Sequence, residues 1–134
     1  MIRGELQDGE RVVPAQSLVE WQVPVREGWT VTIRPDEIDT NTTPLDFEVG
    51  RYSAHDHRDF LAKRLVFIVV VAEVYGRERS LLGSEEIVGV EWRRSGRPQD
   101  LHIGQADVDK LVTTDERKWL TTNAVYHAIQ AGGS

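Results

Sequence analysis

The chain has 134 residues, a formal net charge of −6 and no cysteine. This length is typical of one domain that buries its own core, and we expect a single α+β domain over residues 1–134. The lack of cysteine excludes disulfides and thiolate metal ligands, and the negative charge argues against general binding to nucleic acid. The chain starts with polar residues and no apolar signal segment, so we expect a cytoplasmic protein or one assembled into a particle made in the cytoplasm.

Alternating apolar and polar residues predict strands in the first third of the chain. Residues 2–6 and 11–13 flank Asp8-Gly9, a two-residue hairpin signal. Residues 19–23 and 29–33 each place alternate apolar side chains on one face, as in antiparallel strands with one wet side. From Arg34 to Pro44 the composition predicts a loop, and a short strand is expected over 45–49.

The longest apolar run, from Leu65 to Ala72, predicts a central strand over 65–75. Five of its eight residues are β-branched, and the lack of polar alternation indicates that both faces are covered. The run is too short to cross a membrane, which needs roughly 20 apolar residues. A single helix from Ala54 to Tyr75 is the alternative, and whether 54–64 is helical or extends the strand stays open.

The last third changes from strand to helix. Glu85 and Glu86 are expected in a loop, and residues 88–92 alternate as one strand of a hairpin with 101–103. Residues 105–112 permit a short helix. Thr113 and Glu116 have the form of a capping box, which predicts a helix over 114–131 that ends before Gly132. The expected fold is α+β: a mostly antiparallel sheet of about six strands with a C-terminal helix.

The predicted C-terminal helix has more apolar surface than one face of a sheet covers. Its polar stripe is narrow and consists of four residues: Glu116, Asn123, His127 and Gln130. Either the rest of the fold wraps this surface or another subunit covers it. If a subunit covers it, we expect the contact through four apolar residues: Trp119, Val125, Tyr126 and Ile129.

His55, His57 and Asp59 are candidate metal ligands, because imidazole and carboxylate groups suit zinc. The pattern His-x-His-x-Asp resembles the opening of the metallo-β-lactamase metal signature. Phe60 stands where that family has its next histidine, and the chain is far shorter than that fold, so we do not assign it to the family. A simpler metal site with one distant carboxylate or His102 remains open.

The segment around His55 and His57, and a cluster of arginines later in the chain, also have structural interpretations. Ser53 can cap a short helix whose dipole Asp56 and Asp59 complement, which requires no metal. Arg93, Arg94 and Arg97 are the candidate phosphate ligands, yet arginines at a turn also keep a sheet edge soluble.

No motif in the sequence specifies a reaction. We therefore predict a non-enzymatic structural or interaction subunit of an oligomeric assembly that has no cofactor and binds itself or a protein partner, not a membrane. Small acidic α+β proteins of this kind include virion head and tail components, an analogy at the level of fold. The alternatives are a small enzyme or ligand-binding domain with a helix–sheet pocket, and an acidic inhibitor or immunity-type protein.

Overall fold

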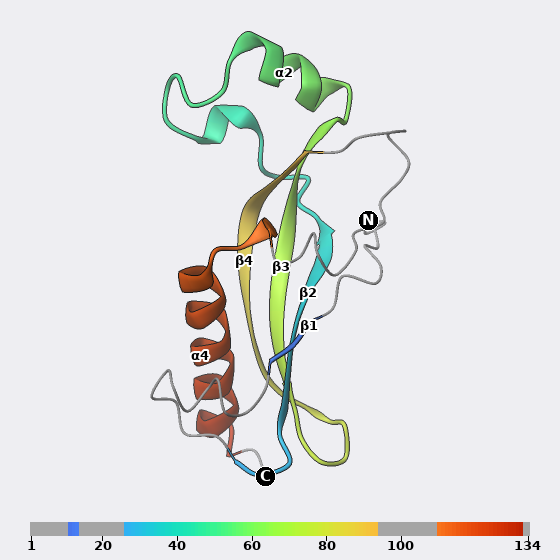
Figure 1. Cartoon of the computed structure of the whole chain (residues 1–134), viewed down its shortest axis with the longest axis vertical. Coiled ribbons are helices and arrows are strands. Elements are labelled where there is room, and N and C mark those ends of the chain that lie inside the picture. The colour runs from blue at the N-terminus through green and yellow to red at the C-terminus, as the bar shows by residue number, and fades with distance from the viewer. Residues whose placement is uncertain (1–10, 14–25, 94–109, 133–134) are drawn as a thin grey trace.

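The computed structural model describes residues 11–13, 26–93 and 110–132. These residues form an antiparallel sheet in the order β1-β2-β3-β4, with helices packed beside it and over one end (Figure 1). The sheet has three long strands, β2 (Thr30–Ile38), β3 (Leu65–Tyr75) and β4 (Leu81–Arg93), and a short edge strand, β1 (Arg11–Val13). The helices are η1 (Pro44–Asp46, a 3-10 helix), α2 (Ala54–Leu61) and α4 (Thr114–Gln130). The α+β class is confirmed, whereas the described residues contain four strands and not six.

β3 is the central strand that the apolar run predicts. It pairs with β2 on one side and β4 on the other, and every residue from Leu65 to Val74 is buried. Alternate residues face opposite sides: Val66, Ile68, Val70, Ala72 and Val74 join the core that includes α4, and Leu65 and Phe67 join a second cluster. Burial of both faces explains why the run lacks polar alternation. The single helix over 54–75 is excluded, because α2 ends at Leu61.

A partly buried ion pair lies on the face of the sheet opposite α4. Glu73 of β3 accepts a hydrogen bond from Nε of Arg34 on β2 at 2.7 Å, and Nη1 of Arg34 lies 3.0 Å from Oδ1 of Asp36. Pairing with Arg34 offsets the cost of burying the Glu73 carboxylate within the sheet.

β2 is longer than predicted. The loop expected from Arg34 to Pro44 is wrong over its first five residues, since the strand continues to Ile38. The register shifts between Pro35 and Glu37, and such a bulge is one of the places where a strand tolerates proline.

α4 packs against β4, β3 and β2. The helix begins with the predicted capping box: the Thr113 hydroxyl accepts from the Glu116 N–H at 3.1 Å, and the Glu116 carboxylate accepts from the Thr113 N–H at 2.7 Å. It ends one residue earlier than predicted, with Ala131 as its C-cap and Gly132 at φ +72°. The buried side chains of the helix are Leu120, Thr121, Ala124, Val125 and Ala128.

The backbones of α4 and β4 approach most closely at Gly83. A Cβ at this position would lie 2.5 Å from the Ala128 nitrogen and 2.6 Å from the Ala124 oxygen, so only glycine fits without moving the helix. Farther along β4, Oε2 of Glu85 lies 2.8 Å from Nε2 of His127 on the helix. Glu85 and Glu86 both lie within β4, so the loop predicted for them is wrong.

A bulge in β4 changes which side chains reach the core. Gly89 has φ +69°, and the register with β3 shifts beside it. As a result Ile87 packs against the same core as Val90, while Val88 is exposed. The expected simple alternation over 88–92 is wrong at Val88 for this reason.

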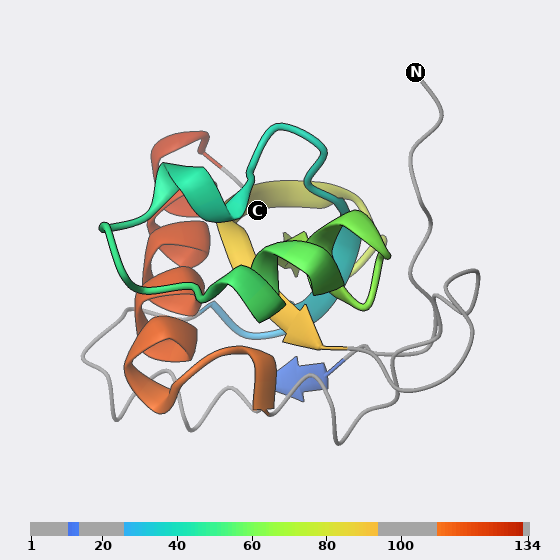
Figure 2. The ribbon, with the colours of Figure 1, turned by 90° about the horizontal axis from the view of Figure 1, so that it is seen from above.

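Residues 39–64, here called the cap, cover the end of the sheet where β3 begins (Figures 1 and 2). The Asp39 carboxylate fixes the start of the cap by accepting from the Gly89 N–H at 3.1 Å and from the Thr42 hydroxyl at 2.6 Å. An aromatic cluster joins the cap to the second face of β3: Phe47, Tyr52 and Phe60 of the cap contact Phe67 of β3 or one another.

The strand predicted over 45–49 is wrong. Pro44–Asp46 form η1, which Thr43 caps, and Phe47 is drawn into the aromatic cluster. The predicted strands over 2–6, 19–23 and 101–103, and most of the segment 105–112, lie outside the described residues.

Candidate functional site

The histidine-containing segment forms α2, and Ser53 caps it as the structural interpretation predicts. The Ser53 hydroxyl accepts from the Asp56 N–H at 3.1 Å, and the Asp56 carboxylate accepts from the Ser53 N–H at 2.8 Å. Two backbone donors at the start of the helix are thereby satisfied. The segment 54–64 is helical as far as Leu61 and does not extend the central strand.

The candidate metal ligands lie on α2 without converging. Nε2 of His55 lies 3.4 Å from Oδ2 of Asp59, one helical turn away, but residues two positions apart on a helix do not face each other, which separates His55 from His57. Asp59 is also bound by Nε of Arg64 at 3.1 Å. Within residues 26–93 and 110–132, no three histidine or acidic side chains form a group that could hold a metal ion.

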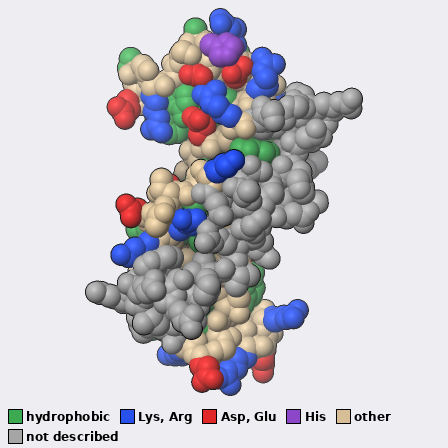
Figure 3. Space-filling view, in the orientation of Figure 1, with side chains coloured by type: hydrophobic (Ala, Val, Ile, Leu, Met, Phe, Trp, Pro, Cys, Tyr) green, Lys and Arg blue, Asp and Glu red, His purple; other side chains and the backbone are tan. Residues whose placement is uncertain are grey.

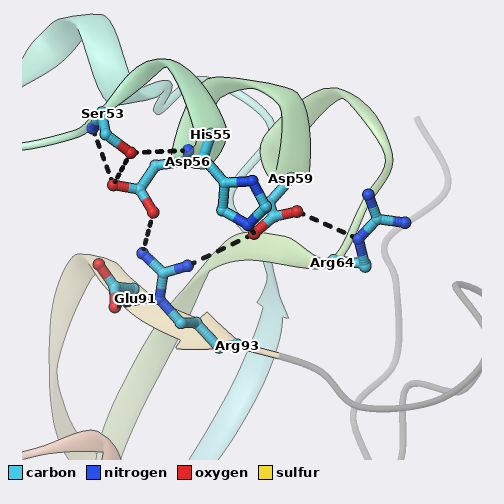
Figure 4. A network of polar contacts seen from close by, with 7 residues as sticks. All are labelled: Ser53, His55, Asp56, Asp59, Arg64, Glu91 and Arg93. Atoms are coloured by element: carbon cyan, nitrogen blue, oxygen red, sulfur yellow. Dashed lines mark hydrogen bonds and ion pairs between the residues drawn. The ribbon is translucent and has the colours of Figure 1, made fainter.

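Arg93, at the end of β4, joins the strand to α2 (Figure 4). Its guanidinium lies 2.8 Å from the Asp56 carboxylate, 3.2 Å from that of Glu91 and 3.7 Å from that of Asp59. Figure 3 shows basic, acidic and hydrophobic side chains mixed at this end of the molecule. Arg93 is therefore engaged by three carboxylates, while Arg94 and Arg97 lie outside the described residues.

The pKa shifts in the cap follow from these contacts. The Ser53 backbone N–H and the Arg93 guanidinium lower the pKa of Asp56 to about 2, and the hydrogen bond to Asp56 raises the pKa of Arg93. Burial, aided by the negative charge of Glu91, raises the pKa of Tyr52 to about 12. Asp56 thus stays ionised and Tyr52 protonated at neutral pH, so neither group suits proton transfer there. The network holds α2 to the sheet.

The four predicted interface residues separate into two groups. Trp119 and Tyr126 are 48% and 55% exposed and lie seven residues apart on α4, close to two full turns. Val125 is fully buried in the core and Ile129 packs against that core. Val125 is therefore an incorrect choice for a contact surface, because the sheet already covers it.

An open apolar notch of about 410 Å³ lies beside Trp119, between α4 and β4. Among the described residues it is lined by Ile87, Asp115, Glu116 and Trp119, and its surface is almost entirely apolar. The Glu116 carboxylate is already engaged by the Thr113 N–H. The notch can accept an apolar group.

No family model, curated protein or solved structure matches the chain. None of the helices among the described residues is long and apolar enough to cross a membrane.

Sequence reasoning missed the notch, because Ile87 approaches the helix only through the tertiary fold. The capping box identified Glu116 at the start of α4, and the apolar pattern identified Trp119. The bulge at Gly89, which turns Ile87 toward the core face, leaves only a weak signal in the sequence: a glycine inside a strand pattern.

Proposed function

We propose that this protein is a non-enzymatic interaction subunit that associates with further copies of itself through the outward side of α4. The observation that carries the proposal is the pair of exposed aromatic residues, Trp119 and Tyr126, aligned along one side of a helix whose other side is packed on the sheet. Tryptophan and tyrosine are, with arginine, the residue types enriched among residues that dominate binding energy at protein interfaces.

The surroundings of these rings favour a protein contact over catalysis. The notch beside Trp119 is apolar, and four ionisable side chains at the end of the sheet are bound in pairs: Arg64 to Asp59 and Arg93 to Asp56. Virion head and tail components are subunits of this kind, and the analogy rests on fold class alone. The acidic inhibitor and the small enzyme are the other interpretations, and no contact among the described residues favours either.

The test measures molar mass by light scattering during size-exclusion chromatography. The wild-type chain should elute as an oligomer, and the double variant Trp119→Ser/Tyr126→Ser as a monomer. Truncating one such anchor costs about 2 kcal/mol or more, roughly a 30-fold weaker Kd.

The matched control is Leu45→Ser/Val49→Ser, which removes two exposed apolar side chains from the cap and should leave the oligomer intact. A wild-type protein that is monomeric at high concentration contradicts the proposal. So does a Trp119→Ser/Tyr126→Ser variant that keeps the wild-type mass.

A further inference from the structure

α2 directs its acidic side chains toward the sheet and presents basic and apolar side chains outward. The side chains of Asp56 and Asp59 are only 19% and 14% exposed, and Arg93 and Arg64 bind them (Figure 4). The exposed residues of the helix fall within one arc of about 120° around its axis: Ala54, His55, Arg58 and Leu61. Because this arc contains no carboxylate, the outward face of α2 is positively charged on a chain whose net charge is −6.

The remaining charges of the cap reinforce this pattern. The carboxylates of Asp39 and Asp46 already accept hydrogen bonds from the cap or from β4, which leaves Glu48 as the cap's one other acidic residue. Arg58 and Lys63 are exposed, and no carboxylate within the described ranges forms an ion pair with either side chain. Their charges are therefore available to a partner.

We infer that the outward face of α2 and the adjacent Lys63 bind an acidic segment of another protein. Arg58 and Leu61 are neighbours on the helix surface, since residues three apart face the same side. Leu61 is 80% exposed, so the two side chains offer a cation beside an apolar contact. An arginine binds a carboxylate through paired hydrogen bonds, and the leucine suits an apolar residue beside that carboxylate. This surface belongs to α2 and not to α4, so the inference goes beyond the proposed self-association.

The small number of cations favours a protein segment over a lipid surface or nucleic acid. Basic clusters that bind anionic lipids contain about four to eight lysines and arginines, whereas this face has Arg58 and Lys63. Nucleic acid needs several phosphate contacts, and the net charge of −6 opposes them. One or two ion pairs around an apolar contact are enough to align a protein segment. Salt screens charges beyond about 8 Å, so the local cations outweigh the acidic residues elsewhere on the chain.

Fluorescence anisotropy with a labelled probe peptide, Glu-Glu-Leu-Glu-Glu-Leu-Glu, tests the inference. The 134-residue chain should bind this probe and not the matching lysine–leucine peptide, and its affinity should fall as salt is added. Arg58→Glu/Lys63→Glu should weaken binding roughly tenfold, because two attractive charges become repulsive. The charge-matched control is Arg77→Glu/Arg79→Glu, which reverses two exposed cations of the β3–β4 turn at the other end of the sheet and should stay close to the wild-type affinity.

Leu61→Ser should weaken binding roughly fivefold, because it removes the apolar contact and leaves the charges. Equal losses in the two charge-reversal variants overturn the inference, since the probe would then sense net charge alone, and a wild-type chain that does not bind the probe overturns it too. Binding to vesicles of phosphatidylcholine and phosphatidylserine without binding to the probe also overturns it, in favour of a membrane surface. Arg58→Glu/Lys63→Glu should keep the wild-type urea midpoint, because both side chains are exposed.

The proposed self-association is read separately from this surface. The variants of α2 leave Trp119 and Tyr126 intact, so failure of the self-association shows as a monomeric mass of the wild-type chain and leaves the probe result unchanged.

Discussion

At the scale of single residues, the ionised side chains around α2 stabilise the cap, and Asp56 is the clearest case. It accepts from the Ser53 N–H at one oxygen and from Arg93 at the other. Its folded pKa of about 2 lies below the value of about 3.9 for an unfolded chain. Because the folded pKa is the lower of the two, the ionised carboxylate stabilises the fold at pH values above the unfolded pKa. This contribution disappears as the pH falls toward 2.

Asp56→Asn should therefore reduce the dependence of the free energy of unfolding on pH between roughly 5 and 2. The measurement is urea unfolding at several pH values for the wild type and the variant. Glu48→Gln, an exposed carboxylate of the same cap, is the matched control. Parallel pH profiles for the wild type and Asp56→Asn would show that the carboxylate has no such role.

Lys63 is held in the left-handed region at φ 60°, where α2 ends. Its N–H donates to the Phe60 carbonyl at 3.1 Å, and the Arg64 N–H donates to the Asp59 carbonyl at 2.8 Å. These two bonds form a Schellman motif, which usually has glycine at the position of Lys63.

Lys63→Gly should raise the free energy of unfolding by about 1 kcal/mol. It removes a backbone cost of roughly 1–2 kcal/mol, partly offset by the greater freedom of glycine in the unfolded chain. Urea denaturation measures the change, and Lys63→Ala, which keeps a Cβ, should show no such gain. A less stable glycine variant would be inconsistent with this backbone account.

At the scale of elements, the seat of α4 on β4 depends on Gly83. Gly83→Ala should lower the free energy of unfolding by about 1–3 kcal/mol, since the added methyl meets the helix backbone and forces α4 to shift. Ser84→Ala, the adjacent and exposed residue of the same strand, is the matched control and should have little effect. Equal urea midpoints for Gly83→Ala and the wild type would argue against this close approach.

Elements with strong local signals were predictable from the sequence. β3 has the bounds that the apolar run indicates, and α4 begins at the predicted capping box, because both signals lie within the element itself. The part of β2 from Arg34 to Ile38 and the face of Val88 were not predictable, because the bulges at Pro35 and Gly89 are set by pairing with β3.

The candidate contact surface on α4 was also predictable only in part. Helical periodicity singled out Trp119 and Tyr126 as part of an unusually apolar helix, and both are exposed. Periodicity could not indicate which side of the helix the sheet covers, so it also selected Val125. The carboxylates around Arg93 come from α2 and β4, and only the folded cap brings them together.

At the scale of the whole molecule, one side of α4 is committed to the sheet and the other presents aromatic rings beside an apolar notch. Within the described residues, the cap and its ion pairs cover the end of the sheet where β3 begins. These features together favour an assembly subunit whose stability comes from its own core and whose contacts come from α4.

Native mass spectrometry of the 134-residue chain over a range of concentrations tests this account most directly. We predict a dimer or a larger oligomer that persists at low micromolar concentration and is lost in Trp119→Ser/Tyr126→Ser. A spectrum that contains only the monomer at every concentration would contradict the central claim.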